Sequence, residues 1–558
     1  MASAAPGAVP RFSILTPVYE TPADVLEAML GSVRAQTCGD WELCIVDDAS
    51  AQPHVGEMLT AAAAADPRIQ VRRNEANLGI VGSSNAALEL CRGEFVVLLD
   101  HDDMLHPAAL TRVAEALDAN PEADYVYTDE DKIDREGHHS SPFFKPDWSP
   151  ERMRTQMYTC HLSVLRRSLI EAVGGFDQDF EGSQDWDLVL KVTEKARAVA
   201  HVPQVLYHWR MLETSAAGGG EEAKPWAFEA GTRAIQAHCD RIGFPARAER
   251  DEARPGVYHL RPALTEHPKV SIVIPTNGQR REVRYEEVVL VEHCVRGIVE
   301  QSTYENYEIV VVYDAVTPPE VLERLVEIAG ERLKLVEFDR PFHFSAKVNF
   351  GAVHGDGEHI LLLNDDIEIS TPEWIERLVM YSSRDGIGAV GARLLWEDGR
   401  LQHCGVLFEN GGYPGHIYRG FPGDHGGYSN NVFVAQDYLA VTGACLMTPR
   451  ALFEELGGLT TTLPNNYNDV DYCLKVHTAG RRVVYDPDTV LFHFESSSRD
   501  SEVDDWEADL LIERWLPVTA VDPSTNPHLR HGLPRISSPF AWMRDRRPRL
   551  LSRSGHPR

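Results

Sequence analysis

The sequence contains one series of motifs twice. Four segments of the first half recur in the same order in the second half, at offsets of 258, 264, 284 and 285 residues. The matched segments are Phe12–Pro17 with Val270–Pro275, Glu94–Asp102 with Glu358–Asp366, Gln184–Val192 with Asn468–Val476, and Val205–His208 with Val490–His493. This period is far longer than that of solenoid repeats, so each copy is expected to be a whole domain.

Each copy alternates short apolar runs with amphipathic stretches. Continuously apolar runs are typical of strands that are buried on both faces of a parallel sheet. The predicted strands are Phe12–Leu15, Glu42–Val46, Phe95–Leu99, Val270–Ile274, Glu308–Val312 and His359–Leu363, and predicted helices include Ala23–Gln36 and His106–Asp118. The pattern predicts an α/β fold with doubly wound, mostly parallel sheets that bind ligands at the carboxyl ends of their strands.

The repeat and the composition divide the chain into four parts. We expect a first domain at residues 1–214, a linker with a helix (Trp226–Ile242) at 215–268, a second domain at 269–500, and an extension at 501–558. The extension ends in a basic tail, Ala541–Arg558, with six arginines and one aspartate. This tail is either a solvated end or a contact with an anionic membrane surface, where lipid-linked acceptors are found.

Composition excludes some classes of partner. The 558 residues include 85 acidic and 54 basic side chains, a net charge of −31, so the surface repels a phosphate backbone and no nucleic-acid partner is expected. Nine cysteines without a C-x-x-C pair favour neither a disulfide framework nor a zinc site, and fit a reducing cytosol. Neither a secretory signal nor a membrane-spanning run is recognisable, so a cytoplasmic location is predicted.

Acidic side chains follow one predicted strand in each copy. Asp100 and Asp102 follow the strand in the first copy, and Asn364 and Asp366 follow it in the second. Oxygen ligands at alternate positions suit a hard cation such as Mg²⁺ or Mn²⁺. An isolated D-x-D is more often a solvated turn, but its recurrence after a hydrophobic strand favours a metal site.

Two further residue types recur at matching positions. Asp185 and Asp469 begin amphipathic helices predicted at Trp186–Lys195 and Val470–Thr478, where an acid either favours the helix dipole or serves as a general base. His208 and His493 each close a Val-Leu-aromatic-His run. Each histidine is either a strand-end residue or a ligand of a metal or diphosphate.

Together these motifs resemble the family 2 glycosyltransferases with the GT-A (Rossmann-like) fold, over roughly residues 11–500. In the first copy the matching segments are Thr16–Glu20, Val46–Ser50, Asn77–Gly79 with Asn85, Leu99–Asp103, Gly174–Asp177, Asp185 and Tyr207–Arg210. In the second copy they are Ile274–Thr276, Phe344–Gly351, Leu363–Asp366, Gly443–Cys445, Gly457–Gly458, Asn468–Asp471 and His493–Ser496. The chain looks most like tandem-domain bacterial enzymes that build surface polysaccharides of the rhamnan and O-antigen types.

The resemblance implies an inverting transfer of sugars from nucleotide-sugar donors to a glycan or lipid-linked glycan. Asp185 and Asp469 would be the bases, and Asp102, His208, Asp366 and His493 would hold Mn²⁺ or Mg²⁺. The implied donor-binding residues are Pro17, Tyr19, Glu20, Asp47, Asp48, Asn77 and Asp100 in the first copy, and Pro275, Thr276, Asp314, Lys347 and Asn364 in the second. A single carboxylate suffices because a metal-bound nucleoside diphosphate is already a good leaving group.

Departures from the family pattern leave alternatives open. Gln184 stands where many relatives have Glu, and Leu212 where many have His; in the second copy the nucleotide aspartates are reduced to Tyr313-Asp314. The second copy is also about 19 residues longer between Asp366 and its Gly-Gly turn, partly within Gln402–Tyr428, which is either an acceptor-binding stretch or a surface loop.

Three classes of function remain. The chain is a bifunctional transferase, or it has one catalytic domain and a second domain for acceptor binding or structure, or it is a nucleotidyltransferase. The last is disfavoured because Thr16–Glu20 has neither the glycines nor the basic residue that holds a triphosphate.

Overall fold

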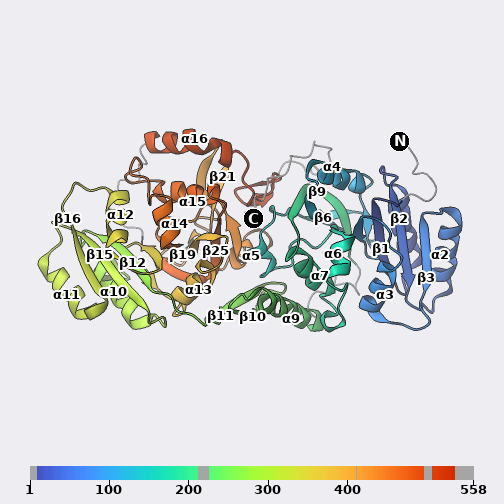
Figure 1. Ribbon diagram of the computed structural model, residues 1–558, viewed down its shortest axis with the longest axis horizontal. Coiled ribbons are helices and arrows are strands. Elements are labelled where there is room, and N and C mark those ends of the chain that lie inside the picture. Colours follow the sequence, from blue (N-terminus) through green and yellow to red (C-terminus); the bar gives the residue numbers. More distant parts are fainter. Residues whose placement is uncertain (1–8, 212–224, 410, 495–504, 535–558) are drawn as a thin grey trace.

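The computed structural model describes residues 9–211, 225–409, 411–494 and 505–534. The two sequence copies form two lobes side by side along the longest axis, the first coloured blue to teal and the second yellow to red (Figure 1). Each lobe is built around one large sheet with helices packed on it. The predicted tandem α/β organisation is confirmed.

The first domain contains a nine-stranded sheet. Its strands are β1 (Phe12–Val18), β2 (Trp41–Asp47), β3 (Ile69–Arg73), β4 (Phe95–Leu98), β5 (Met104–Leu105), β6 (Ala123–Ile133), β7 (His139–Phe143), β8 (Ser163–Arg166) and β9 (Ala198–Arg210). Its helices are α1 (Ala23–Arg34), α2 (Pro53–Ala65), α3 (Gly79–Leu88), α4 (Ala109–Ala119), α5 (Pro150–Met153), α6 (Arg167–Ala172) and α7 (Gln184–Thr193). The strand order is β3-β2-β1-β4-β8-β6-β9-β5, with β7 beside β6.

The second domain repeats this architecture. Its main sheet consists of β12 (Val270–Thr276), β15 (Tyr307–Asp314), β16 (Leu333–Phe338), β17 (His359–Leu363), β18 (Ile367–Ile369), β19 (Ile387–Leu395), β20 (Leu401–His403), β23 (Gln436–Tyr438), β24 (Cys445–Pro449) and β25 (Arg482–His493). Its helices are α10 (Leu290–Gln301), α11 (Pro319–Ala329), α12 (Phe344–His354), α13 (Trp374–Ser382), α14 (Arg450–Glu455) and α15 (Asn468–Thr478). The order β16-β15-β12-β17-β24-β19-β25-β18 matches the first sheet strand for strand.

Parallel pairing brings the ends of the central strands to one edge. In the first sheet β1 pairs in parallel with both β2 and β4, whereas β8 runs antiparallel between β4 and β6. All seven residues of β2 are buried, which fits its largely apolar sequence. Because Val18 lies opposite Asp47 and Leu15 opposite Leu98, the segments that follow β1, β2 and β4 meet at that edge.

The linker is a packed element that spans both lobes. Helix α9 (Pro225–Ile242) lies against α7, and the hairpin of β10 (Ala246–Arg250) and β11 (Tyr258–Pro262) follows it, along the lower side of Figure 1. Arg377 of α13 donates from Nη1 to the carbonyl oxygen of Leu260, at 3.2 Å. The linker therefore contacts the helices of both domains.

The described part of the C-terminal extension also joins the two domains. Helix α16 (Asp505–Thr519) packs on the second domain, where Trp515 donates from Nε1 to Asp471 Oδ1 at 2.8 Å, and a short hairpin of β26 (Leu529–Arg530) and β27 (Leu533–Pro534) follows. In the segment between α16 and this hairpin, Asn526 donates from Nδ2 to Asp129 Oδ2 at 2.9 Å and to the carbonyl of Lys145 at 2.8 Å. The predicted basic tail lies outside the described residues.

The extra stretch of the second copy, Gln402–Tyr428, contributes to the contact between the domains. It contains the hairpin of β21 (Val406–Glu409) and β22 (Tyr413–His416); a second hairpin of this domain is β13 (Arg280–Val283) with β14 (Glu286–Val289). The hydroxyl of Tyr428 accepts from the backbone N–H of Phe144 at 2.9 Å and donates to the carbonyl of Pro142. This end of the stretch is therefore not a free surface loop.

Among the described helices, none has the length and apolarity needed to cross a bilayer.

Candidate active sites

The predicted donor residues of the first domain lie where β1 and β2 end. Asp48 Oδ1 accepts from the backbone N–H of Leu78 and from Asn74 Nδ2, both at 2.8 Å. These bonds tie the segment that contains Asn77 to the end of β2. Asp47 accepts from the backbone N–H of Ser50 at 3.0 Å and forms an ion pair with Arg73. The two carboxylates thus shape the loops around the edge of the sheet.

The turn after β1 closes the same edge. Glu20 has a positive φ of 49°, and its Oε1 accepts from the backbone N–H of Ala51 at 2.6 Å. Tyr19 beside it is 48% exposed, so its ring is available to a ligand. Pro17 lies near the end of β1, and Asn77 Oδ1 accepts from the backbone N–H of Gly79, the first residue of α3, at 3.1 Å. The roles of these residues in donor binding stay predictions.

The acidic loop after β4 is held by the last residues of β9. Tyr207 donates from its hydroxyl to Asp103 Oδ2 at 2.5 Å and accepts from Asp100 N at 3.3 Å. Arg210 donates from its backbone N–H to Asp103 Oδ1 at 2.7 Å and from Nε to the carbonyl of Asp102 at 2.9 Å. Burial, with Asp102 and Asp100 nearby, raises the pKa of Asp103 well above its ordinary value. Asp103 is therefore part of the support of this loop.

His161 joins this loop from the segment that precedes β8. Ligand atoms of Asp100, Asp103 and His161 all lie within 4.8 Å of one another, and the imidazole stacks on Tyr207 with centroids 4.5 Å apart. The predicted base Asp185, in the first turn of α7, is close enough to interact electrostatically with them. Burial raises the pKa of Asp185 and Asp100 raises it further, whereas His161 opposes the rise.

His208 lies in a separate cluster beside the acidic loop. Its Nδ1 is 2.7 Å from Asp131 Oδ1, and the other carboxylate oxygen of Asp131 is 2.9 Å from His139 Nδ1. Strand pairing places His208 opposite Met104, the residue that follows Asp103. The carboxylate of Asp131 is fully buried, so this contact is shielded from solvent.

The second domain brings its predicted metal ligands together directly. His493 Nε2 is 3.0 Å from Asp366 Oδ1 and 3.1 Å from Asn364 Nδ2. The other ring nitrogen, Nδ1, is 2.7 Å from Gln402 Oε1. The predicted residues Asn364, Asp366 and His493 therefore form one compact site.

The predicted donor residues of the second domain are also in contact. Lys347, almost fully buried, donates from Nζ to the carbonyl of Thr276 at 2.7 Å and pairs with Asp314 Oδ2 at 2.7 Å. Thr276, which follows Pro275, donates from its hydroxyl to Asp365 Oδ2 at 2.6 Å. Burial and the neighbouring Asp366 raise the pKa of Asp365 to about 7. These contacts link the ends of β12, β15 and β17.

The predicted base of the second domain has a different environment from Asp185. Asp469 Oδ2 accepts from the backbone N–H of Gly443 at 2.7 Å, and the adjacent carbonyl of Ala444 accepts from Asn364 N at 3.0 Å. Sheet register aligns Ala444 with His161 of the first domain, so a small residue replaces the imidazole. The Gly443–Ala444 segment thus connects Asp469 with Asn364, which lies next to the predicted metal ligands.

The carboxylates two residues further along both helices make contacts of their own. Asp187 pairs with Lys191 at 2.7 Å, and Asp471 accepts from Trp515 Nε1. Both are buried, and their contacts support the packing of α7 and α15.

The profile of the family described as "Glycosyl transferase family 2" matches residues 13–174 and 271–453. The chain belongs to this family. It is 38% identical over 532 residues to the uncharacterized protein y4gI of Sinorhizobium fredii, covering 93% of this chain and 58% of that one. It is 36% identical over 525 residues to the O-antigen biosynthesis protein RfbC of Myxococcus xanthus, covering 93% of this chain and 40% of that one. The chain thus spans about half the length of these relatives.

One solved structure illustrates how distant the structural matches are. The S. aureus TarS fragment 1–349 in complex with UDP-GlcNAc aligns with a TM-score of 0.34 at 19% identity, over 41% of this chain and 66% of that chain. In this family 2 chain, the sequence patterns gave no role to His161, Asp131 or Gln402. Asp103 lies within the recognised segment Leu99–Asp103, but no role was predicted for it. Tyr207 and Arg210 belong to the recognised segment Tyr207–Arg210. That match was the sequence signal from which their role in holding the acidic loop could have been predicted.

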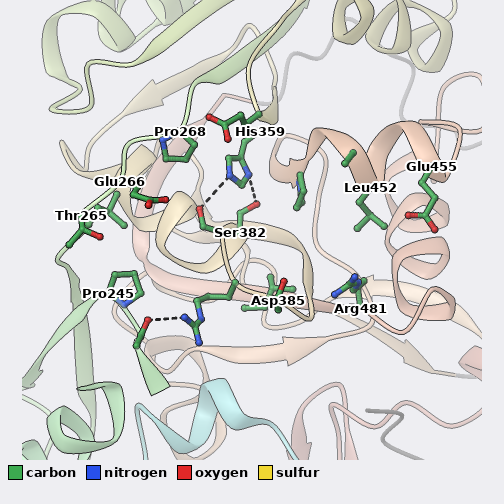
Figure 2. Close-up of a pocket in the computed structure, with 18 residues that line it drawn as sticks. Pro245, Thr265, Glu266, Pro268, His359, Ser382, Asp385, Leu452, Glu455 and Arg481 are labelled. Carbon is green, nitrogen blue, oxygen red and sulfur yellow. Dashed lines mark hydrogen bonds between the residues drawn. The ribbon is translucent and has the colours of Figure 1, made fainter. Parts of the chain in front are cut away.

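A hollow of about 570 Å³ lies away from both sites of this family 2 chain. Figure 2 shows it between the linker, at Pro245 and Thr265, and the second domain, at Leu452 and Arg481. His359 on its wall is the first residue of β17, whereas the metal ligands follow the last residue of that strand. The hollow therefore opens at the opposite edge of the sheet.

Proposed function

We propose that the chain is a bifunctional, metal-dependent, inverting glycosyltransferase. It transfers sugars from nucleoside-diphosphate donors to a growing bacterial surface glycan. The observation that carries the proposal is the placement of Asp185 and Asp469, each in the first turn of a helix beside an acidic loop at the carboxyl end of a strand. The 36% identity to an O-antigen biosynthesis protein supports the class of product.

The donor is bound at the ends of the first two strands of each copy. In the first domain Asp47, Asp48 and the Pro17–Glu20 turn hold the base and ribose, with Asn77 and Asp100 completing the pocket. In the second domain the donor is bound by Thr276, Asp314 and Lys347. The Lys347 contact with Asp314 supports a preformed pocket, because the two side chains fix each other's position.

The side chains of the second domain fit a divalent cation. Gln402 Oε1 only accepts hydrogen bonds, so Nδ1 of His493 donates to it and Nε2 is the ring nitrogen that faces Asp366. The carboxylate oxygen of Asp366 and Nε2 of His493, 3.0 Å apart, are the kinds of donor atom that such a cation binds. Asp366 and His493 would hold Mn²⁺ or Mg²⁺ here, as would Asp102 and His208 in the first domain. The cation would neutralise the leaving diphosphate.

The transfer is a single displacement. The acceptor hydroxyl attacks the anomeric carbon while the bond from that carbon to the diphosphate oxygen breaks, so the configuration inverts. Asp185 or Asp469 takes the hydroxyl proton as the new bond forms. Burial raises the pKa of Asp185 above its ordinary value, which makes this carboxylate a stronger proton acceptor than an ordinary aspartate.

Separate substitutions test both bases. Asp185→Asn and Asp469→Asn should each lower one transfer activity by about 10²- to 10⁴-fold, measured as release of nucleoside diphosphate from a panel of nucleotide sugars. If either variant retains every activity of the unsubstituted chain, that domain is not catalytic. Release of pyrophosphate in place of nucleoside diphosphate would indicate a nucleotidyltransferase.

A second candidate is a chain whose second domain only binds the acceptor. Asn364 replaces an acidic ligand, and an oxygen of Asp469 already accepts from Gly443 N, which favours this alternative. It predicts that Asp469→Asn leaves all donor turnover intact and weakens only acceptor binding. Kinetics with varied acceptor concentration separate the two candidates.

Peripheral membrane contact through Ala541–Arg558 is part of the proposal. These basic residues would attract anionic lipids near a lipid-linked acceptor. Deleting them should reduce sedimentation with anionic vesicles and leave binding to neutral vesicles unchanged.

A further inference from the structure

Two histidines at matching positions are held through the same ring nitrogen by different partners. Sheet pairing places His208 opposite Met104 and His493 opposite Ile367, each directly after the acidic loop of its domain. In the first domain Nδ1 contacts a carboxylate oxygen of Asp131, and in the second it contacts the amide oxygen of Gln402, both at 2.7 Å. Both domains therefore hold this histidine through Nδ1, but the partner is a charged carboxylate in the first domain and a neutral amide in the second.

Both contacts specify the same orientation of the imidazole ring. An ionised carboxylate and an amide oxygen only accept, so Nδ1 must donate in each case, and Nε2 is the ring nitrogen that points away from Asp131 or Gln402. The consequence is visible in the second domain, where Nε2 faces Asp366 Oδ1 at 3.0 Å. In its neutral form, an imidazole held in this orientation directs Nε2 toward the acidic loop, where it could bind a metal.

Each partner is itself fixed. Gln402 donates from Nε2 to the carbonyl of His493 at 3.5 Å, which orients its amide so that Oε1 faces the ring. Asp131 is fully buried, lies opposite His208 in the pairing of β6 with β9, and contacts His139 through its second oxygen. Neither contact depends on a flexible surface side chain.

A carboxylate and an amide differ in what they do to the ring. Negative charge on the acceptor makes the imidazole a stronger electron-pair donor toward a cation, and partners of this kind typically change metal affinity about 10- to 100-fold when removed. A neutral amide orients the ring but adds no charge. The second domain also has Asn364 where the first has Asp100, so its site carries less negative charge overall.

We infer that Asp131 and Gln402 are positioning residues for the metal-binding histidines, and that the carboxylate gives the first domain the higher affinity for a divalent cation. The inference rests on the metal dependence proposed above. It predicts two sites of unequal affinity in one chain, the weaker one in the second domain.

The cluster allows one rival interpretation. Asp131, His139 and His208 offer ligand atoms within 4.8 Å of one another, so they could hold an ion directly. Direct ligation requires all three side chains. Positioning requires only an acceptor at Asp131, and an asparagine supplies one. The two interpretations therefore differ in their response to Asp131→Asn and His139→Ala.

Binding of Mn²⁺ to the full chain, followed by the electron paramagnetic resonance signal of free Mn²⁺, tests the inference. Asp366→Ala in the background isolates the first site, and Asp102→Ala isolates the second. Asp131→Ala should weaken the first site about 10- to 100-fold, Asp131→Asn should fall between Asp131→Ala and the unsubstituted residue, and Gln402→Ala should weaken the second site. His139→Ala should change the affinity only a few-fold.

The controls separate folding from binding. Each variant is melted without metal, and Asp131→Asn and Gln402→Ala remain informative if Asp131→Ala does not fold. Unchanged affinity in Asp131→Asn and Gln402→Ala would overturn the inference, as would equal loss in Asp131→Asn, His139→Ala and Asp131→Ala. If the unsubstituted chain binds no Mn²⁺, the proposed metal dependence fails together with the inference.

Discussion

Asn85 holds Phe176 through both ends of its amide. Its Nδ2 donates to the carbonyl of Phe176 at 2.8 Å, and its Oδ1 accepts from the backbone N–H of the same residue at 3.0 Å. Asn349 binds Leu459 in the same way in the second domain, at 2.8 Å for both bonds. Helices α3 and α12 are thereby fastened to the Gly-Gly turns that precede the helices of Asp185 and Asp469.

This clamp predicts unequal effects of alanine at two adjacent glycines. At Gly175 (φ 74°) an added Cβ would lie 2.7 Å from Asn85 Oδ1, whereas at Gly174 (φ 88°) nothing lies within 4 Å. Both alanines meet an unfavourable φ, which costs about 1 kcal/mol. Gly175→Ala should lower the thermal midpoint further than Gly174→Ala, and Gly458→Ala further than Gly457→Ala. Equal losses would show that the amide moves aside freely.

The buried ion pair of the second domain predicts a large loss of stability. Lys347→Met leaves Asp314 without its cation, and breaking a buried pair costs about 3–5 kcal/mol. Lys334 provides the control because its pair with Glu308 is 42% exposed on the lysine side, so Lys334→Met should cost about 1 kcal/mol or less. Denaturant unfolding compares the two variants. A cost for Lys347→Met no larger than that for Lys334→Met contradicts this prediction.

The C-terminal extension is predicted to stabilise the first domain. Asn526→Ala removes the hydrogen-bond donor to Oδ2 of the buried carboxylate of Asp129, and leaving a buried acceptor atom unpaired costs about 1–3 kcal/mol. The other oxygen, Oδ1, keeps its contacts with Lys145 N and His201 Nε2. Asn306, whose amide donates to the carbonyl of His267 at an exposed position, serves as the control. Limited proteolysis should cut the first domain faster in Asn526→Ala than in Asn306→Ala. Identical cleavage rates would show that the extension is dispensable there.

His359 predicts a pH dependence of stability. Burial lowers the pKa of His359 to about 4, whereas an unfolded histidine titrates near 6.5. Between these values the unfolded chain binds the extra proton, so this contribution is present above pH 6.5 and is lost as the pH falls toward 4. The loss is at most about 3 kcal/mol.

Thermal midpoints measured from pH 4.5 to 7.5 test the assignment. Other groups also titrate in this range, so the informative quantity is the difference in slope between the unsubstituted chain and His359→Gln. The variant should have the shallower decline toward acid pH. Parallel curves would assign the acid sensitivity to other residues.

Local sequence was sufficient for most of the secondary structure. The prediction Glu42–Val46 became β2 (Trp41–Asp47), and Ala23–Gln36 became α1 (Ala23–Arg34). Continuous burial and helical periodicity are properties of neighbouring residues, so they are visible in a window of the sequence. The antiparallel strand β8 and the hairpin of β10 and β11 were not predicted, because short strands depend on partners distant in the sequence.

The sequence by itself determined the duplication, the fold class, the family and the positions of the acids that follow the strands. These features depend on order and spacing along the chain. Only the tertiary structure decided which side chains support those acids. His161 and Asp131 lie in segments without a recognisable motif, and Gln402 begins a stretch that the sequence did not connect with the predicted metal ligands. All three reach the sites because the sheet brings distant strands together. The two domains therefore differ in the side chains that contact the predicted metal-binding histidines. These contacts depend on which strands are neighbours in the sheet, and the spacing of motifs along the sequence does not show that.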